Sequence, residues 1–331
     1  MRRRQFIGLM GTAALSTAQS GYAQTNSALP LVGVLSPSRQ DFSKDRIAAL
    51  RKGLQEAGFI EGANYSLATR FAEGDLDRLP QLVRELGVLK PRVIVVIGFG
   101  IAAVRRSLPD LPLVFTAIAA DPVALGLAQS YVHPGGMVTG NVLNAIGGEE
   151  ALTEKRMGLF KELVPTLTRL GVVSTAKNPV AIAELDALQK VAGHLGFEVV
   201  HYNIQTPDDL ENAFASGLRD DVSAFYLSGE PLLISNMSRV MSFVAASGKP
   251  TVGVYPEWGR AGLLMSYSSD VVDGVRHAGT YVAKILSGTK PGDLPIEQAS
   301  KFTFVINLKT AKTLGIAVPP TLLSLADEVI E

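Results

Sequence analysis

Short apolar runs alternate with stretches of helical periodicity along almost the whole chain, and this alternation constrains the fold more than any other feature. The run 93–97 is apolar at every position, which is typical of a strand buried on both faces. A stretch with helical spacing, 101–107, follows it directly. Strands that alternate with helices in this way predict right-handed crossovers and parallel sheets.

The alternation occurs twice, and the chain of 331 residues exceeds the ~100–200 residues of an ordinary domain. The stretch 135–148 between the two halves is rich in glycine and has neither periodicity. We therefore expect an α/β fold of two doubly wound parallel-sheet lobes. The expected strands are 31–35, 66–71, 93–97, 113–116, 169–174, 198–202, 224–227, 251–254, 263–267 and 302–306, and the expected helices are 45–57, 76–86, 101–107, 149–163, 181–195, 207–218, 233–247, 271–286 and 320–329.

The N-terminus has the pattern of an export signal. Arg2-Arg3-Arg4 forms a basic region of the twin-arginine kind, a weakly apolar stretch 6–18 follows, and Gly21-Tyr22-Ala23 is a small-residue cleavage site. The apolar stretch falls short of the ~20 residues that span a bilayer. We expect a signal peptide over residues 1–23, cleaved near Ala23, and a mature protein in the periplasm. Sec-dependent export and an amphipathic N-terminal helix remain the alternatives.

Charge and composition exclude several classes of function. The chain has no net charge, and removal of residues 1–23 leaves 28 basic and 31 acidic residues, which argues against a nucleic-acid partner. No cysteine is present, so disulfides, thiolate metal sites and cysteine nucleophiles are excluded. The four histidines lack metal-ligand spacing, and no P-loop, nucleophile elbow or zinc-protease motif occurs. We expect no catalytic residues, no metal and no cofactor.

Candidate ligand-binding residues follow the ends of the expected strands, because ligands of open parallel sheets bind beyond the carboxyl ends. Gly98 and Gly100 precede a helix, where backbone could approach an anion or simply form a tight turn. Asp121 could cap a helix or bind an ammonium group. Trp258 suits a cleft wall or packing at its rim equally well. The candidates chosen this way are Ser36, Ser38, Gly98, Phe99, Gly100, Asp121, Asn178, Ser228, Glu230 and Tyr255.

Several motifs resemble a known family. Residues 53–64 read G-L-Q-E-A-G-F-I-E-G-A-N, and they are followed by His133-Pro134-Gly135-Gly136, by 262–267 (G-L-L-M-S-Y) and by 305–312 (V-I-N-L-K-T-A-K). In order and spacing these motifs are similar to those of the ABC-transporter substrate-binding family that includes tryptophan- and tyrosine-binding members. The resemblance extends from about Leu31 to Glu331.

The resemblance implies a type I periplasmic-binding fold, with two lobes joined by a hinge of three crossovers. It also implies that Ser36, the loop 98–101, Asp121, Asn141, Asn178, Glu230 and Tyr255 face the ligand. Two positions depart from the family pattern: Phe99 replaces a small hydroxyl residue, and Glu230-Pro231 replaces Asp-Pro. These departures prevent the transfer of any known member's ligand.

The interpretation that unites these observations is an importer's receptor that catalyses nothing. We expect a monomer that binds a small molecule, an amino acid or related carboxylate, and delivers it to a membrane permease. The alternatives are a periplasmic sensor that feeds a membrane receptor and a periplasmic α/β enzyme. The expected boundaries are 24–145 plus 270–297 for the first lobe and 146–269 plus 298–331 for the second.

Overall fold

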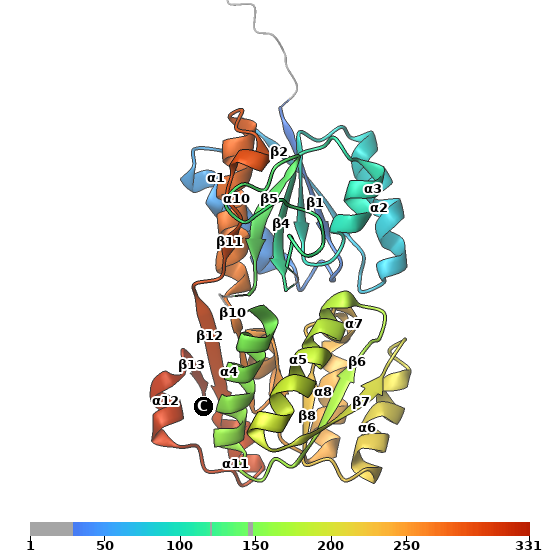
Figure 1. Ribbon diagram of the computed structural model, residues 1–331, viewed down its shortest axis with the longest axis vertical. Helices are drawn as coiled ribbons and strands as arrows, with labels where there is room; N and C mark the ends of the chain where they lie inside the picture. The colour runs from blue at the N-terminus through green and yellow to red at the C-terminus, as the bar shows by residue number, and fades with distance from the viewer. Residues whose placement is uncertain (1–28, 120, 145–147) are drawn as a thin grey trace, which may run out of the picture.

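The computed structural model describes residues 29–119, 121–144 and 148–331, so the expected signal peptide lies outside the described part. Two sheets with covering helices form two lobes, one above the other in Figure 1. The predicted α/β class with two doubly wound, mainly parallel sheets is confirmed.

The first lobe is built on a sheet with the strand order β11-β5-β4-β3-β1-β2, in which all pairs are parallel. Helices α1 and α10 cover one face, whereas α2 and α3 lie on the other (Figure 1). Its elements are β1 (Leu31–Ser36), α1 (Lys44–Glu56), β2 (Ser66–Phe71), η1 (Leu76–Arg78), α2 (Leu79–Val88), β3 (Val93–Ile97), α3 (Ile101–Ser107), β4 (Leu113–Ile118), β5 (Val138–Val142), α10 (Val271–Leu286), η2 (Pro291–Asp293) and β11 (Glu297–Gln298).

The second lobe is built on a sheet with the order β13-β12-β10-β9-β8-β6-β7. Strand β12 pairs antiparallel with β10, which is the one exception to parallel pairing among the described strands. Its elements are α4 (Gly148–Leu163), β6 (Arg169–Ser174), α5 (Pro179–Leu195), β7 (Glu198–Asn203), α6 (Asp209–Arg219), β8 (Ala224–Leu227), α7 (Pro231–Ser235), α8 (Met237–Ser247), β9 (Thr251–Gly253), α9 (Pro256–Ala261), β10 (Met265–Ser269), β12 (Phe302–Asn307), α11 (Leu308–Thr313), α12 (Pro320–Leu325) and β13 (Glu328–Ile330).

Both sheets share one strand order, and it positions the site. In each lobe the first strand pairs on one side with the second and on the other with the third, as β1 does with β2 and β3 and β6 with β7 and β8. The order of strands reverses at this point, so the loops after β1 and β3 diverge and leave a crevice at the carboxyl edge. The loops after β6 and β8 do the same in the second lobe.

Alternating side chains of the central strands pack on opposite faces of the first sheet. Val93, Val95 and Ile97 contact the core under α1 and α10, whereas Ile94 and Val96 belong to the core under α2 and α3. This explains why the run 93–97 is apolar throughout: both faces of the strand exclude water.

Helix α10 returns to the first lobe and packs closely on α1. Gly53 and Gly279 allow this approach, because a Cβ on Gly279 would lie 2.5 Å from the Leu50 carbonyl oxygen. The chain crosses between the described parts of the lobes after β5, after β10 and after β11. Close backbone contact between α1 and α10 therefore holds the segment that follows the second crossing in the first lobe.

Several local expectations were wrong. The helix expected over 320–329 ends at Leu325, and Glu328–Ile330 forms strand β13. The glycine-rich stretch 135–148 contains strand β5, whose five residues include Gly140 and Asn141 instead of an apolar run. The single helix expected over 233–247 is two helices, α7 and α8, with a break at Asn236. The strand expected over 263–267 begins at Met265. Among the described residues, no helix is long and apolar enough to cross a bilayer.

Candidate functional site

Loops from both lobes meet where the carboxyl edges of the two sheets face each other. Pro37, Ser38, Gly98 and Ala117 follow or end strands of the first sheet, and Asn178, Gly229 and Tyr255 follow strands of the second. Together with Arg46, Ile97, Phe99, Val180, Pro231 and Ile234 they line a narrow hollow of about 30 Å³. We call this space the narrow hollow.

Two larger hollows adjoin it. One of about 650 Å³ is lined mainly by polar residues, among them Glu73, Asp75, Lys177 and Glu230, and we call it the polar hollow. The other, of about 500 Å³, is lined mainly by Leu79, Ile101, Leu127 and other apolar residues of the first lobe, and we call it the apolar hollow. Phe99 lines all three hollows, so its ring stands where they meet.

In the first lobe, small residues and bare backbone form the wall. Ser38 and Gly98 line the narrow hollow, whereas Ser36 is fully buried behind it, with its hydroxyl oxygen 3.1 Å from that of Ser43. Ala117 has a left-handed backbone (φ 57) beside a register shift in β4, a strained conformation that turns the end of the strand. Ser36 thus shapes the loop, and Ser38 faces the cleft.

Gly100 begins helix α3, which has only seven residues. It lies with Ile101 and Ala103 along the apolar hollow, not the narrow one. Of the two alternatives, an anion site or a tight turn, the mainly apolar lining favours the tight turn, although Arg106 also lines this hollow. Gly100 has a φ of 136, which favours glycine, and a Cβ there would meet Leu35 at 3.2 Å.

In the second lobe, Asn178 and Glu230 shape the loops after β6 and β8. The Asn178 side-chain oxygen accepts a hydrogen bond from the Val180 amide at 3.0 Å and so caps α5. One Glu230 oxygen accepts bonds from the Thr175 amide (2.8 Å) and the Ser228 hydroxyl (3.2 Å). The other is buried without a partner. Burial raises the Glu230 pKa to about 7, although the bonds from Thr175 and Ser228 lower it.

Tyr255 and Glu184 hold the peptide of Gly229 between them. The Tyr255 hydroxyl donates to the Gly229 carbonyl at 3.1 Å, and the Gly229 amide donates to the Glu184 carboxyl group at 3.0 Å. Burial, followed by the charge of Glu149, raises the Glu184 pKa to about 8. The loop after β8 is thus fixed from both sides.

Arg156 lies behind this loop and is fully buried. Its guanidinium donates to the Tyr226 hydroxyl and to the Tyr267 carbonyl, both at 2.7 Å, and lies 3.7 Å from the Glu149 carboxyl group. The Tyr226 hydroxyl in turn donates to Glu184 at 3.4 Å. A buried network of charged and polar groups therefore runs from the core of the second lobe to the cleft.

The structure does not bring Asp121 and Asn141 to these hollows. Asp121 is exposed, and its side-chain oxygen accepts from the Val123 amide at 2.8 Å in a turn. Asn141 accepts from the Thr116 hydroxyl and donates to the Gly274 carbonyl, both at 2.8 Å. It lines a separate hollow of about 220 Å³ at the crossing segments.

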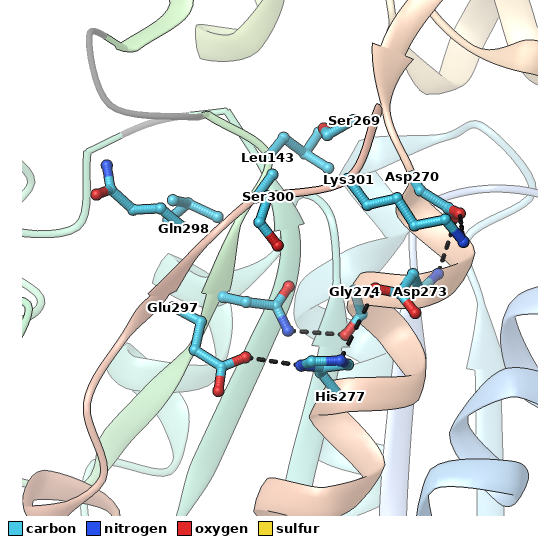
Figure 2. Close-up of a pocket in the computed structure, with 13 residues that line it drawn as sticks. Leu143, Ser269, Asp270, Asp273, Gly274, His277, Glu297, Gln298, Ser300 and Lys301 are labelled. Atoms are coloured by element: carbon cyan, nitrogen blue, oxygen red, sulfur yellow. Dashed lines mark hydrogen bonds and ion pairs between the residues drawn. The ribbon is translucent and has the colours of Figure 1, made fainter. Parts of the chain in front are cut away.

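Figure 2 shows this separate hollow, where a hydrogen bond and an ion pair join the crossing segments. His277 lies 2.9 Å from Glu297, and Lys301 lies 2.9 Å from Asp270. The Asn141 amide donates to the Gly274 carbonyl in α10. These contacts tie the three crossings together, so the position of Asn141 fits a hinge better than a ligand wall.

Two residues have environments that differ from expectation. Trp258 is fully buried in the second lobe and lines none of the hollows described here. Arg46, which was not among the candidates, lines the narrow hollow and is 5 % exposed. The helical spacing of Arg46 indicates a buried position, since Arg46 lies four residues before Leu50 on the apolar stripe of α1.

The cleft offers small polar side chains, the Arg46 guanidinium and the aromatic rings of Phe99 and Tyr255. Among the described residues, no cluster of His, Cys, Asp or Glu could hold a metal ion. This arrangement suits the binding of a small molecule with both polar and apolar parts.

The comparisons with known proteins agree with this geometry. The family model described as ABC transporter substrate binding protein matches residues 32–330. A protein of Clostridioides difficile (strain R20291) named tyrosine-binding protein is 26 % identical over 267 residues, which are 80 % of this chain and 75 % of that protein.

Two solved structures have the same fold, each with a TM-score of 0.81. A conserved domain protein of Vibrio cholerae is 24 % identical, and the match covers 91 % of this chain and 99 % of that one. A domain from Streptococcus pneumonia in complex with L-Trp is 23 % identical and covers 92 % and 100 %.

Proposed function

The chain belongs to the family of ABC transporter substrate-binding proteins, and from this premise we propose that it captures an amino acid or related carboxylate between its lobes for an importer. The observation that carries the proposal is that the loops after β1 and β3 of the first lobe meet those after β6 and β8 of the second around Phe99. A tyrosine-binding relative and a fold neighbour holding L-Trp support this class of ligand.

We propose that residues 24–145 and 270–297 form the first lobe and that 146–269 and 298–331 form the second. The sheet contents support this division except at Gln298, which pairs with Val142 and so belongs to the first sheet. Otherwise β11 pairs with β5 of the first lobe, and β12 pairs with β10 of the second. Export with cleavage near Ala23 would place the receptor in the periplasm, where it would act as a monomer on a membrane permease. Mass analysis of the secreted chain and light scattering check these points.

An enzyme is the main competing function, and one contact bears on it. The Ser174 hydroxyl lies 2.9 Å from Nε2 of His201, a spacing that a nucleophile and its base could adopt. Ser174 is fully buried, however, and neither residue lines the three hollows around Phe99. The pair therefore joins neighbouring strands, and we propose that the protein alters no ligand.

Calorimetry with the twenty amino acids and with aromatic carboxylic acids tests the proposal. We expect one-to-one binding of at least one of them, and mass spectrometry of the released molecule should show it unchanged. Absence of binding across this set, or chemical conversion of the ligand, would contradict the proposed function.

A further inference from the structure

Arg46 is a buried cation with free hydrogen-bond donors at the cleft. Its side chain extends from the first turn of α1 and lines the narrow hollow. Both Nε and Nη2 are buried without a hydrogen-bond partner. An unpaired buried donor on a charged group is costly, so this position calls for an acceptor.

The groups around Arg46 orient it but leave these donors free. Its guanidinium carbon lies 4.2 Å from the centre of the Phe42 ring and 5.4 Å from that of Tyr255, so it is held between a ring of each lobe. Glu257 is the ion-pair partner, with Oε1 3.6 Å from Nη2, which is longer than a hydrogen bond. Glu257 therefore compensates the charge without satisfying the donors.

A second feature of the narrow hollow favours an anion. Helix α5 has 17 residues and begins at Pro179, directly after Asn178, which lines the same space. The positive end of a helix dipole attracts negative charge. Arg46 from the first lobe and the start of α5 from the second thus border the same hollow.

The sizes of the hollows indicate the shape of the ligand. The narrow hollow of about 30 Å³ has room for a small polar group and not for a whole amino acid. Gly98, Phe99 and Val180 line both this hollow and the apolar one of about 500 Å³. A ligand with a small anionic head and an apolar body fits the two spaces together.

We propose that Arg46 binds the carboxylate of the ligand in the narrow hollow while the apolar body of the ligand lies beyond Phe99 in the apolar hollow. The inference rests on the proposed function and makes it more specific. The ligand must carry a carboxylate, and Arg46 is the residue that recognises it.

The test compares acids with their uncharged derivatives. Binding of L-tyrosine, L-tryptophan and 3-phenylpropionate, of the corresponding amides, and of myo-inositol as a neutral molecule is measured by calorimetry on the purified protein. We expect an acid to bind about 10- to 100-fold more tightly than its amide, as hydrogen bonds to charged groups imply. In Arg46→Met, whose unbranched side chain fits between the same rings, acid and amide should bind within about twofold of each other.

Three further variants make the assignment specific. Arg46→Lys should recover part of the preference for the acid, since it restores the charge without the planar fork. Arg51→Met, on the same helix but paired with Glu61 at the surface, should leave the preference unchanged. Glu257→Gln should also keep it; if Glu257→Gln instead abolishes the preference as Arg46→Met does, Arg46 only joins the lobes and the inference is overturned.

The outcomes separate this inference from the proposed function. Equal binding of acid and amide by the unaltered protein overturns the role of Arg46 and leaves the receptor function intact, and this comparison needs no variant to fold. Binding of myo-inositol alone also overturns it. Failure to bind any of these molecules, or any of the twenty amino acids and aromatic carboxylic acids, contradicts the proposed function itself, and the inference with it.

Discussion

The two lobes share one strand order but reach the cleft with different chemistry. Among the described residues, the first lobe buries no carboxyl group, and its rim includes the small residues Ser38, Gly98 and Ala117 beside Phe99 and the cation Arg46. The second lobe buries Glu184 and Glu230 together with Arg156. The same topology thus supports a rim of small residues in one lobe and a buried ionic network in the other.

This difference separates two ways of fixing a loop. In the first lobe, the backbone has little conformational freedom, because α1 and α10 are in close backbone contact and β4 ends in a strained conformation at Ala117. In the second lobe, two buried side chains hold the peptide of Gly229: its amide donates to Glu184, and its carbonyl accepts from Tyr255. We therefore expect the first lobe to be sensitive to added volume and the second to lost charge and to pH.

The largest effect should come from the ionic network. Arg156→Met would leave the Glu149 carboxyl group without its cation and the Tyr226 hydroxyl and Tyr267 carbonyl without their donor, and we expect it to lower the free energy of unfolding by about 3–5 kcal/mol. Urea denaturation measures this loss. Arg169→Met is the matched control in the same lobe, because Arg169 pairs with Glu198 at the surface, and it should cost at most about 1 kcal/mol. Equal losses of unfolding free energy in the two variants would show that the buried ionic network contributes no more than a surface ion pair.

Added volume should matter next, in the first lobe. Gly279→Ala would force α10 away from α1, and we expect a loss of about 1–3 kcal/mol in urea denaturation. Gly193 lies in helix α5 of the second lobe, where an added Cβ would have no neighbour within 4 Å, so Gly193→Ala should be neutral or stabilise by about 1 kcal/mol. Destabilisation by Gly193→Ala as large as that by Gly279→Ala would contradict the account.

The pH dependence of stability should come from the second lobe. The Glu184 pKa is raised from 4.5 to about 8 and the Glu230 pKa to about 7, so the folded state holds protons that the unfolded chain releases above pH 4.5. Their contribution to stability is fully present below pH 4.5 and is lost as the pH rises towards 7–8, at up to about 1.4 kcal/mol per pH unit for each group.

Glu184→Gln should flatten this dependence, as measured by unfolding free energies between pH 5 and pH 8. Glu198→Gln is the control, because Glu198 is exposed on β7 of the same lobe and should leave the slope unchanged. An unaltered slope in Glu184→Gln would show that this carboxyl group is ionised in the folded protein at every pH tested.

The smallest effect is expected at Phe99, which lines all three hollows. Phe99→Ala removes an aromatic wall of the first lobe, and we expect about 3- to 10-fold weaker binding of an aromatic amino acid by calorimetry. Leu125 lines the same apolar hollow but is 55 % exposed, so Leu125→Ala should change affinity less. Tighter binding by Phe99→Ala would show that the ring obstructs the ligand.

Periodicity predicted most of the strands in both sheets, because buried parallel strands are apolar at every position. The loops that meet at the cleft follow from the ends of those strands. Strand β5 escaped prediction because Gly140 and Asn141 interrupt any apolar run. Packing explains both residues: a Cβ on Gly140 would collide with the backbone of Phe115, and Asn141 bonds Thr116 and Gly274.

The candidate site was predicted less completely than the fold. Ser38, Gly98, Phe99, Asn178 and Tyr255 line the narrow hollow, as their positions after strands predicted. Asp121 follows a strand as well, yet its turn carries it to the surface, which spacing alone does not reveal. Arg46 was missed because a charged residue in an amphipathic helix is ordinarily taken to face solvent.

The central claim is that a small molecule is held between two lobes that close on it. The chain has no cysteine, so Arg84→Cys on α2 and Glu211→Cys on α6 provide two unique sites for spin labels, one on each lobe. Helices α2 and α6 both lie on the right of Figure 1, α2 in the upper lobe and α6 in the lower. Pulsed electron resonance then gives the distance between the lobes. The account predicts a broad distribution that becomes shorter and narrower when a ligand identified by calorimetry is added; an unchanged distribution at saturation would contradict it.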